Sequence, residues 1–159
     1  NFFLGGFISV KSFISNSYWG FDVEDNAVVI LQTETNQLAM LHSSATFWKH
    51  MFQLTVVLEE GYLIVEGLLS KTGSYGRETL TIARRQFEDE AEAVGNPSEE
   101  SVYFDRDRSW ELELERFISA IRNDAPIIGS ASSDALKVME LVTACYEESD
   151  LPGYRKKDR

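Results

Sequence analysis

The order of strand-like and helix-like segments is the feature that most constrains the fold of this chain. Segments rich in β-branched and aromatic residues fill its first two thirds, and two amphipathic helical segments follow. Short polar turns separate several of the strand-like segments, which is typical of antiparallel hairpins. Because the strands all precede the helices, this order favours an α+β domain over the alternating strands and helices of a parallel sheet.

The strand pattern predicts a largely antiparallel open sheet of five or six strands. Thr35-Asn36 marks a hairpin turn after an apolar run, and Glu59-Glu60-Gly61 marks another. The strand from Leu38 to Trp48 alternates between two faces. The candidate strands are residues 7–14, 27–33, 38–48, 52–58, 62–69 and 78–84, with residues 102–104 as a weaker candidate.

Two helices are predicted after the strands. Ser109 can cap the first, which Pro126 ends, and Ser132 or Ser133 can cap the second. Both helices repeat apolar residues at helical spacing, and the apolar face of the second is broad. We therefore expect the two C-terminal helices to cover one face of the sheet. The other face would then be free to bind a partner subunit.

Size and charge limit the function classes. A chain of 159 residues is about one domain, which we place at residues 1–150, followed by a basic C-terminal tail at 151–159. A net charge of −11 repels phosphate backbones, so nucleic acid is not an expected partner. No apolar run approaches the roughly 18 residues of a membrane span. The single cysteine, Cys145, is compatible with a reducing compartment, so we expect a cytoplasmic protein.

The sequence holds no complete catalytic, cofactor or metal motif. Neither Gly5-Gly6 nor Gly73-Ser74-Tyr75-Gly76 has the spacing of a dinucleotide or phosphate loop. His42 and His50 have no nearby cysteine with which to hold a metal. Cys145 lies in an apolar helical segment and reads as a packed thiol. We therefore expect no catalytic, cofactor-binding or metal-binding residue in this chain.

The stretch from His42 to His50 is unusually polar and aromatic for a strand. Hydroxyl and ammonium donors beside an aromatic face suit a polyhydroxylated ligand, because the ring covers C–H surface while the donors pair hydroxyls. A strand end with exposed polar residues explains the same pattern equally well, so both interpretations stay open. If the stretch binds a ligand, its candidate substrate-binding residues are Ser43, Ser44, Thr46, Trp48 and Lys49, and Tyr75, which lies outside the stretch, is a weaker candidate.

Several motifs, in this order, resemble the C-terminal domain of the glucose–fructose oxidoreductase / inositol dehydrogenase / MocA (Gfo/Idh/MocA) family. The resemblance spans nearly the whole chain, and its specificity lies in the order and spacing of motifs that are individually weak. The motifs are residues 23–31, Leu41-His42-Ser43-Ser44, Glu59-Glu60-Gly61-Tyr62-Leu63, Gly73-Ser74-Tyr75-Gly76, Trp110-Glu111-Leu112-Glu113, residues 117–121, residues 133–139 and Ala144-Cys145-Tyr146.

The resemblance implies a dihydrodipicolinate-reductase-like C-terminal domain that builds a substrate pocket and packs its open sheet face on another subunit. In the family, an N-terminal domain holds NAD or NADP, a lysine follows that domain, and an Asp and a His sit on the helix before the first strand. None of these segments matches this sequence, and residues 5–10 resemble those that directly follow that helix. We therefore expect a fragment that lacks the N-terminal nucleotide-binding domain and is inactive alone.

The leading interpretation is the substrate-binding and oligomerisation domain of an NAD(P)-dependent oxidoreductase that acts on a sugar, sugar derivative or polyol. The expected partners are a sugar-like small molecule and further copies of the same chain, with no membrane. The alternative is a self-contained, non-enzymatic ligand-binding or assembly module. The sequence does not name the sugar or choose between NAD and NADP.

Overall fold

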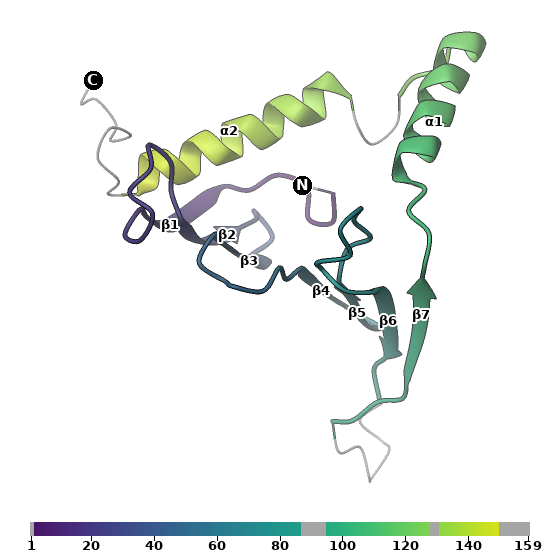
Figure 1. The fold of residues 1–159 in the computed structure, drawn as a ribbon, viewed down its shortest axis with the longest axis horizontal. Helices are drawn as coiled ribbons and strands as arrows, with labels where there is room; N and C mark the ends of the chain where they lie inside the picture. Colours follow the sequence, from purple (N-terminus) through teal and green to yellow (C-terminus); the bar gives the residue numbers. More distant parts are fainter. Residues whose placement is uncertain (1, 87–94, 128–130, 150–159) are drawn as a thin grey trace. The chain divides into compact units, whose positions relative to one another are not determined.

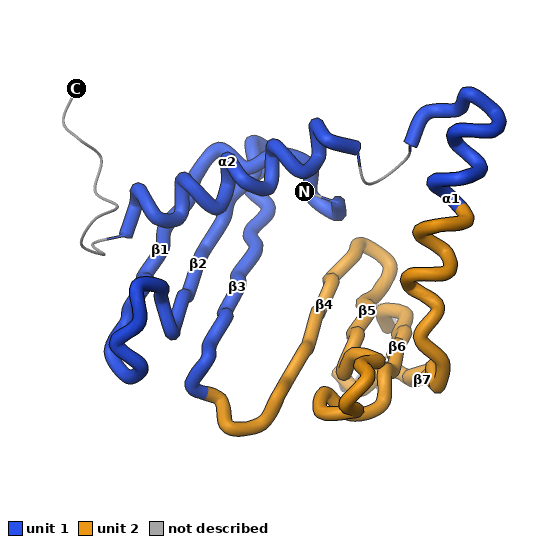
Figure 2. The backbone as a smooth tube through the Cα atoms, turned by 45° about the horizontal axis from the view of Figure 1, so that its top comes forward, with its two compact units in different colours: residues 1–46, 116–159 blue, residues 47–115 orange. Residues whose placement is uncertain are grey.

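A computed structural model describes residues 2–86, 95–127 and 131–149, and within them the strands and helices follow the expected order (Figure 1). The chain divides into two compact units (Figure 2). Unit 1 consists of residues 1–46 and 116–159, and unit 2 consists of residues 47–115. The predicted basic tail at 151–159 lies outside the described residues.

Unit 1 contains an antiparallel sheet in the order β1-β2-β3. Its strands are β1 (Ser9–Ser15), β2 (Asn26–Gln32) and β3 (Leu38–Ser44). The predicted hairpin turn joins β2 to β3: Asn36 has a positive φ of 64°, and its N–H donates to the Thr33 carbonyl at 3.1 Å. Asparagine tolerates this left-handed conformation better than most residues, which explains the position of the turn.

The two faces of this sheet differ in burial. Val29 and Leu31 of β2 are buried on one face, together with the Ser12 side chain of β1. Lys11, Ile30 and Met40 are cross-strand partners, so they share the opposite face. Ile30 is 49% exposed there and Met40 is 77% exposed. The sheet therefore has one packed face and one open apolar face.

Helix α2 (Ser132–Glu148) packs against β1 of unit 1. The Ser12 hydroxyl donates to the Cys145 carbonyl, which ties the helix to the packed face. The Tyr146 hydroxyl donates to the Glu24 carboxylate. Burial raises the pKa of the Cys145 thiol, which keeps it in the less reactive protonated form. The prediction that the second helix covers one sheet face agrees with this packing.

The start of α2 differs from the prediction. Ala131, not Ser132 or Ser133, is the N-cap residue, and its side chain cannot accept a hydrogen bond. The Asp134 carboxylate instead accepts the Ala131 N–H at 3.1 Å. A carboxylate in the first turn also complements the helix dipole. The N-cap thus lies one residue before the first of the two candidate serines, and the helix begins at Ser132.

Unit 2 contains a second antiparallel sheet in the order β4-β5-β6-β7. Its strands are β4 (Gln53–Leu58), β5 (Gly61–Glu66), β6 (Glu78–Arg84) and β7 (Glu99–Phe104). Strand β7 begins at Glu99 rather than at Val102, because Glu99 and Glu100 also pair with β6. Ala83 is the most deeply buried apolar residue of this sheet, at 3% exposure.

The strands therefore form two sheets, of three and four strands, where the sequence predicted one sheet of five or six. The α+β class and the antiparallel pairing are as predicted. The difference arises after Ser44, where β3 ends although the alternating pattern continues to Trp48. Alternation marks residues that can extend, but strand pairing also needs a neighbouring backbone, which a pattern in one segment does not reveal.

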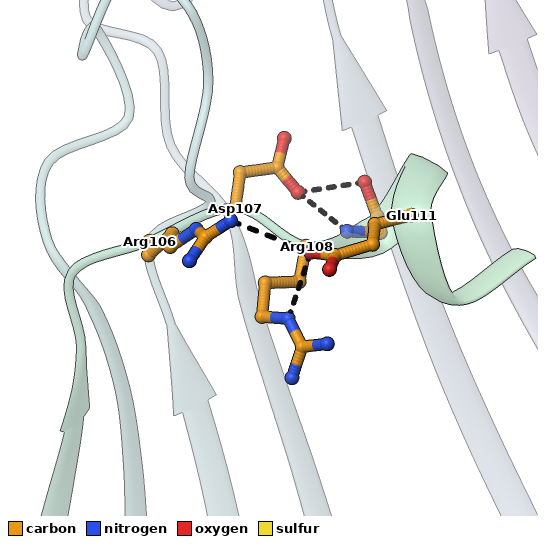
Figure 3. Close-up of polar contacts among 5 residues, drawn as sticks. Arg106, Asp107, Arg108 and Glu111 are labelled. Carbon is orange, nitrogen blue, oxygen red and sulfur yellow. Dashed lines mark hydrogen bonds and ion pairs between the residues drawn. The ribbon is translucent and has the colours of Figure 1, made fainter. Parts of the chain in front are cut away.

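Helix α1 (Ser109–Asn123) begins at a group of polar contacts (Figure 3). The Asp107 carboxylate accepts the Ser109 N–H at 2.9 Å and the Ser109 hydroxyl at 2.7 Å. Arg106 and Arg108 both pair with Glu111 of the first turn. Ser109 thus donates to a carboxylate rather than capping the helix itself.

Within the described residues, neither helix combines the length and the apolar character that crossing a membrane requires.

Candidate functional site

The connections at one end of the unit 2 sheet are the best candidate for a site. Gln53 at the start of β4 pairs with Glu66 at the end of β5, and Glu66 pairs with Thr79 near the start of β6. Glu78 pairs with Phe104 at the end of β7. Antiparallel pairing therefore brings three segments to the same end of this sheet: residues 47–52, 67–77 and 105–108.

Backbone contacts fix the segment 67–77 at this end. The Gly67 N–H donates to the Phe52 carbonyl at 3.0 Å, and the Glu78 carboxylate accepts the Leu69 N–H at 3.1 Å. Gly73 and Gly76 have positive φ angles of 66° and 79°, and their N–H groups close two successive turns. Glycine adopts such angles at no steric cost. The loop is therefore held by both its ends and its turns.

An ion pair also connects this loop to the residue that follows strand β7. The Arg77 guanidinium donates to both oxygens of Asp105, at 2.7 and 2.8 Å. It also lies 4.4 Å from the centre of the Tyr103 ring. The hydrogen bonds from Arg77 hold the pKa of the Asp105 carboxyl below its ordinary value. A bidentate ion pair has a defined geometry, so it orients the loop even though both side chains are exposed.

His50 joins the two longer segments. Its Nδ1 lies 2.7 Å from the Ser74 hydroxyl, and its ring centre lies 5.1 Å from that of Tyr75. The Thr72 hydroxyl lies 2.9 Å from that of Ser74. Tyr75 is half-buried, whereas His50 and Ser74 are exposed. An imidazole, two hydroxyls and an aromatic ring thus form one exposed cluster, which we call the His50 cluster.

Two of the predicted substrate-binding residues immediately precede this cluster in the chain. Trp48 and Lys49 belong to unit 2, like Tyr75, and both are exposed, Trp48 to 75%. The contact between His50 and Tyr75 links their segment to the predicted glycine-bounded loop. The structure therefore brings the segment of Trp48 and Lys49 to the loop of Tyr75, the weaker of the candidate residues.

The other predicted residues lie in unit 1 and do not all face one way. The Ser44 and Thr46 hydroxyls are 2.8 Å apart, and the Asn26 amide donates to Thr46 at 3.1 Å. Ser43 is paired with Ala27 and so lies on the opposite face of β3 from Ser44. Ser44 and Thr46 therefore form a small polar group with Asn26, and Ser43 is separate from it.

Asp25 organises the backbone beside this polar group. Its carboxylate is buried at 3% exposure and accepts the N–H groups of Tyr18 and Trp19 at 2.7 and 3.1 Å. The bond from Tyr18 is the main cause that lowers the pKa of Asp25. The Trp19 indole N–H donates to the Ala45 carbonyl at 3.1 Å. The loop after β1 is thereby fixed to the residue that precedes Thr46.

Sequence reasoning missed the two residues that connect the site. The sequence places His50 in the polar stretch and considers it as a metal ligand with His42, but does not include it among the candidate binding residues, and it places Ser74 only in a loop. A possible signal was the occurrence of three hydroxyl residues, Ser70, Thr72 and Ser74, in that one loop. Their meeting with one another and with an imidazole depends on the turns of the loop and on pairing between β4, β5 and β6.

The described residues contain neither a cluster of metal ligands nor a typical dinucleotide-binding loop. They contain no group of three or more histidine, cysteine or carboxylate side chains placed to hold a metal. The glycines of loop 67–77 join two antiparallel strands, β5 and β6, whereas a dinucleotide loop leads from a strand into a helix. The chemistry of these residues is thus hydrogen bonding and aromatic contact.

Comparisons with known proteins give matches to solved structures only. No protein-family model matches the chain. No curated protein matches it either. UDP-N-acetylglucosamine 3-dehydrogenase from Acidithiobacillus ferrooxidans is similar, with a TM-score of 0.69 and 15% identity over 91% of this chain and 41% of that one.

Two further solved structures share the fold. A proposed NADPH-dependent oxidoreductase from Desulfitobacterium hafniense has a TM-score of 0.71 and 17% identity, covering 92% of this chain and 41% of that one. The aldose-aldose oxidoreductase from Caulobacter crescentus has a TM-score of 0.65 and 14% identity, covering 90% and 39%.

The coverage figures define what is shared. Nearly the whole of this chain matches, but it spans only about two fifths of the length of these solved structures. At such low identity the likeness concerns the fold and not the reaction. This chain therefore has the fold found in part of the Gfo/Idh/MocA-type oxidoreductases, the family that its sequence motifs resemble.

Proposed function

We propose that this chain is the substrate-binding and oligomerisation domain of an NAD(P)-dependent oxidoreductase acting on a sugar, a sugar derivative or a polyol. The observation that carries the proposal is the contact, through His50, between the polar and aromatic stretch that suggested a polyol ligand and the loop of Tyr75, the weaker candidate residue. The shared fold supports it, since the similar structures include a sugar-nucleotide dehydrogenase and an aldose oxidoreductase.

The residue types suggest which contact each side chain would make with the substrate. In this proposal Trp48 and Tyr75 of unit 2 supply aromatic surface for C–H groups, and Lys49 of the same unit supplies a hydrogen-bond donor. Ser43, Ser44 and Thr46 lie in unit 1, so their predicted role in substrate binding stays a separate prediction. The charge of Lys49 suits a phosphate or carboxylate on the substrate, if the substrate carries one.

The cofactor belongs to another part of the whole protein in this proposal. NAD or NADP would be held by a nucleotide-binding domain and would supply the hydride chemistry. No residue described here is assigned to the cofactor or to catalysis, so the chain alone is expected to be inactive. We place the protein in the cytoplasm, where nicotinamide cofactors and reduced thiols are both abundant.

Substitution of Trp48 or Lys49 tests the proposed function. In the protein that contains this chain, NAD(P)-linked turnover of a panel of sugars and polyols is measured. Trp48→Ala and Lys49→Ala are each expected to lower kcat/KM by about tenfold, because each loses a substrate contact worth about 1.4 kcal/mol. Lys137→Ala, which removes an exposed lysine of α2, is the matched control and should leave kcat/KM unchanged.

Two results would contradict this assignment in different ways. Unchanged kcat and KM in both variants would remove Trp48 and Lys49 from the site while leaving the enzyme class intact. Absence of any NAD(P)-linked turnover, combined with measurable binding of a panel member, would favour the alternative of a non-enzymatic ligand-binding module.

Oligomerisation is the second part of the proposal. The open face of the unit 1 sheet exposes Phe13 to 81%, Met40 to 77% and Leu38 to 67%. Large apolar surfaces of this kind commonly mark an interface. We expect a dimer or larger oligomer by light scattering at micromolar concentration, and we expect Met40→Glu to shift it toward monomer. A wild-type chain that stays monomeric would contradict this part.

A further inference from the structure

The hydrogen bond at Nδ1 of His50 determines what its other ring nitrogen can do. Nδ1 lies 2.7 Å from the Ser74 hydroxyl, and Ser74 in turn lies 2.9 Å from the hydroxyl of Thr72. The Ser70 and Thr72 hydroxyls are 3.4 Å apart. Side chains at alternate positions of one loop thus form a row of hydroxyls that ends at the imidazole.

The row of hydroxyls can be protonated in either direction. If it runs from Ser70 through Thr72 to Ser74, Ser74 donates to Nδ1 of His50, and the neutral imidazole carries its proton at Nε2. If it runs the other way, the Nδ1–H group donates to Ser74, and Nε2 is an acceptor. In both cases Ser74 engages Nδ1, and Nε2 is the ring nitrogen left to meet a ligand.

The Tyr75 ring fixes the orientation of this imidazole. The two ring centres are 5.1 Å apart and the planes are inclined by 37°, so the half-buried tyrosine supports the exposed histidine. Within the described part of the chain, Ser74 and Tyr75 are the contacts recorded for His50, and both lie on the loop 67–77. Nε2 has no protein hydrogen-bond partner among these residues.

We propose that His50 contacts the ligand directly, through a hydrogen bond between Nε2 and a hydroxyl of a sugar or polyol, and that Ser74 positions it. This inference rests on the proposed function and adds to it a residue that the sequence interpretation did not include among the binding residues. The ligand class follows from the cluster, which combines one oriented ring nitrogen with adjacent hydroxyls and an aromatic ring. Vicinal hydroxyls, which both donate and accept, complement such a set.

Histidine NMR tests the proposal directly, because the chain contains only two histidines. Long-range proton–nitrogen spectra of the ¹⁵N-labelled chain distinguish the tautomers, and His42→Gln assigns the His50 signals. We expect one tautomer of neutral His50 to predominate because Ser74 engages Nδ1, and we expect Ser74→Ala to change the tautomer populations. Added D-glucose, D-glucose 6-phosphate or myo-inositol should shift the His50 signals, while ethylene glycol at equal hydroxyl concentration should shift them less.

Two substitutions of His50 separate the roles of its nitrogens. Asparagine places its amide near the position of Nδ1 and so can keep the contact with Ser74, but it has nothing at Nε2. Glutamine reaches the position of Nε2. We expect His50→Asn to weaken binding of the best probe by about tenfold and His50→Gln by no more than about threefold. The circular dichroism of both variants should match the wild type, since His50 is exposed.

The possible results distinguish failure of the His50 inference from failure of the proposed function. Backbone signals that shift with a sugar while those of His50 do not would overturn this inference and leave the proposed function standing. Equal binding by His50→Asn and the wild type would overturn it as well. If none of the three polyols shifts any signal of the chain, both the inference and the proposed sugar pocket are wrong.

Discussion

Replacing Gly67 by alanine is expected to destabilise unit 2 by about 3 kcal/mol or more. Gly67 has a φ of 73°, and a Cβ there would lie 2.3 Å from the Arg77 carbonyl oxygen and 2.9 Å from its carbonyl carbon. Both atoms belong to the backbone, so no side-chain rotation can relieve the overlap. The strand ends themselves would have to separate.

This separation would also disturb the candidate site. The N–H of Gly67 donates to the Phe52 carbonyl, which holds the start of loop 67–77 next to the segment that carries His50. We therefore expect Gly67→Ala to lower the melting temperature by roughly 6 °C or more. The His50 signals should change as well, because the contact with Ser74 depends on the loop position.

Gly73→Ala is the matched control. Gly73 has a similar φ of 66°, but no heavy atom lies within 4 Å of the Cβ position. It should therefore show only the cost of a left-handed alanine, about 1 kcal/mol. Equal melting temperatures for the two variants would show that the overlap with Arg77, which distinguishes them, is absent in solution.

The contrast between Gly67 and Gly73 shows which features of the fold can be predicted from the sequence and which cannot. The fold class, the antiparallel pairing and the order of elements followed from local patterns, since alternation and turn residues act within a few positions. The division into two sheets did not follow, because the end of β3 at Ser44 depends on which backbone lies beside it. Likewise the sequence places Gly67 inside the candidate strand 62–69, whereas β5 ends at Glu66 and the Arg77 backbone approaches Gly67 closely.

The same distinction applies to the candidate site. Residue types and the family resemblance suggested Trp48, Lys49 and, more weakly, Tyr75 as pocket residues, and their segments have a common location in unit 2. The alternation of the strand already put Ser43 and Ser44 on opposite faces, but residue types alone did not choose between two small hydroxyls. They also left His50 without a role, since its partner lies 24 residues away in the sequence.

Substitution of Asp25 has the second large expected effect. Asp25→Ala removes a buried acceptor from the N–H groups of Tyr18 and Trp19. Removing a charged acceptor from such part-buried N–H groups costs stability. We expect a melting temperature lower by roughly 5 °C, measured at neutral pH. Asp22→Ala, an exposed carboxylate of the same loop, should change it little.

The stability that Asp25 contributes should decrease at low pH. Folding lowers the pKa of Asp25 below the ordinary value of 3.8, chiefly through the hydrogen bond from the Tyr18 N–H. The ionised carboxylate therefore contributes its full stabilisation above about pH 3.8 and loses it as the pH falls further. The difference in stability between wild type and Asp25→Ala should narrow in that acidic range.

Asp25→Asn separates charge from hydrogen bonding in the same experiment. The amide keeps one oxygen acceptor but carries no charge, so its stability should lie between those of the wild type and Asp25→Ala at neutral pH. Its difference from the alanine variant should not change between pH 3 and pH 5, because neither residue titrates there. A wild-type advantage that persists undiminished well below pH 3.8 would show that the carboxylate acts through shape alone.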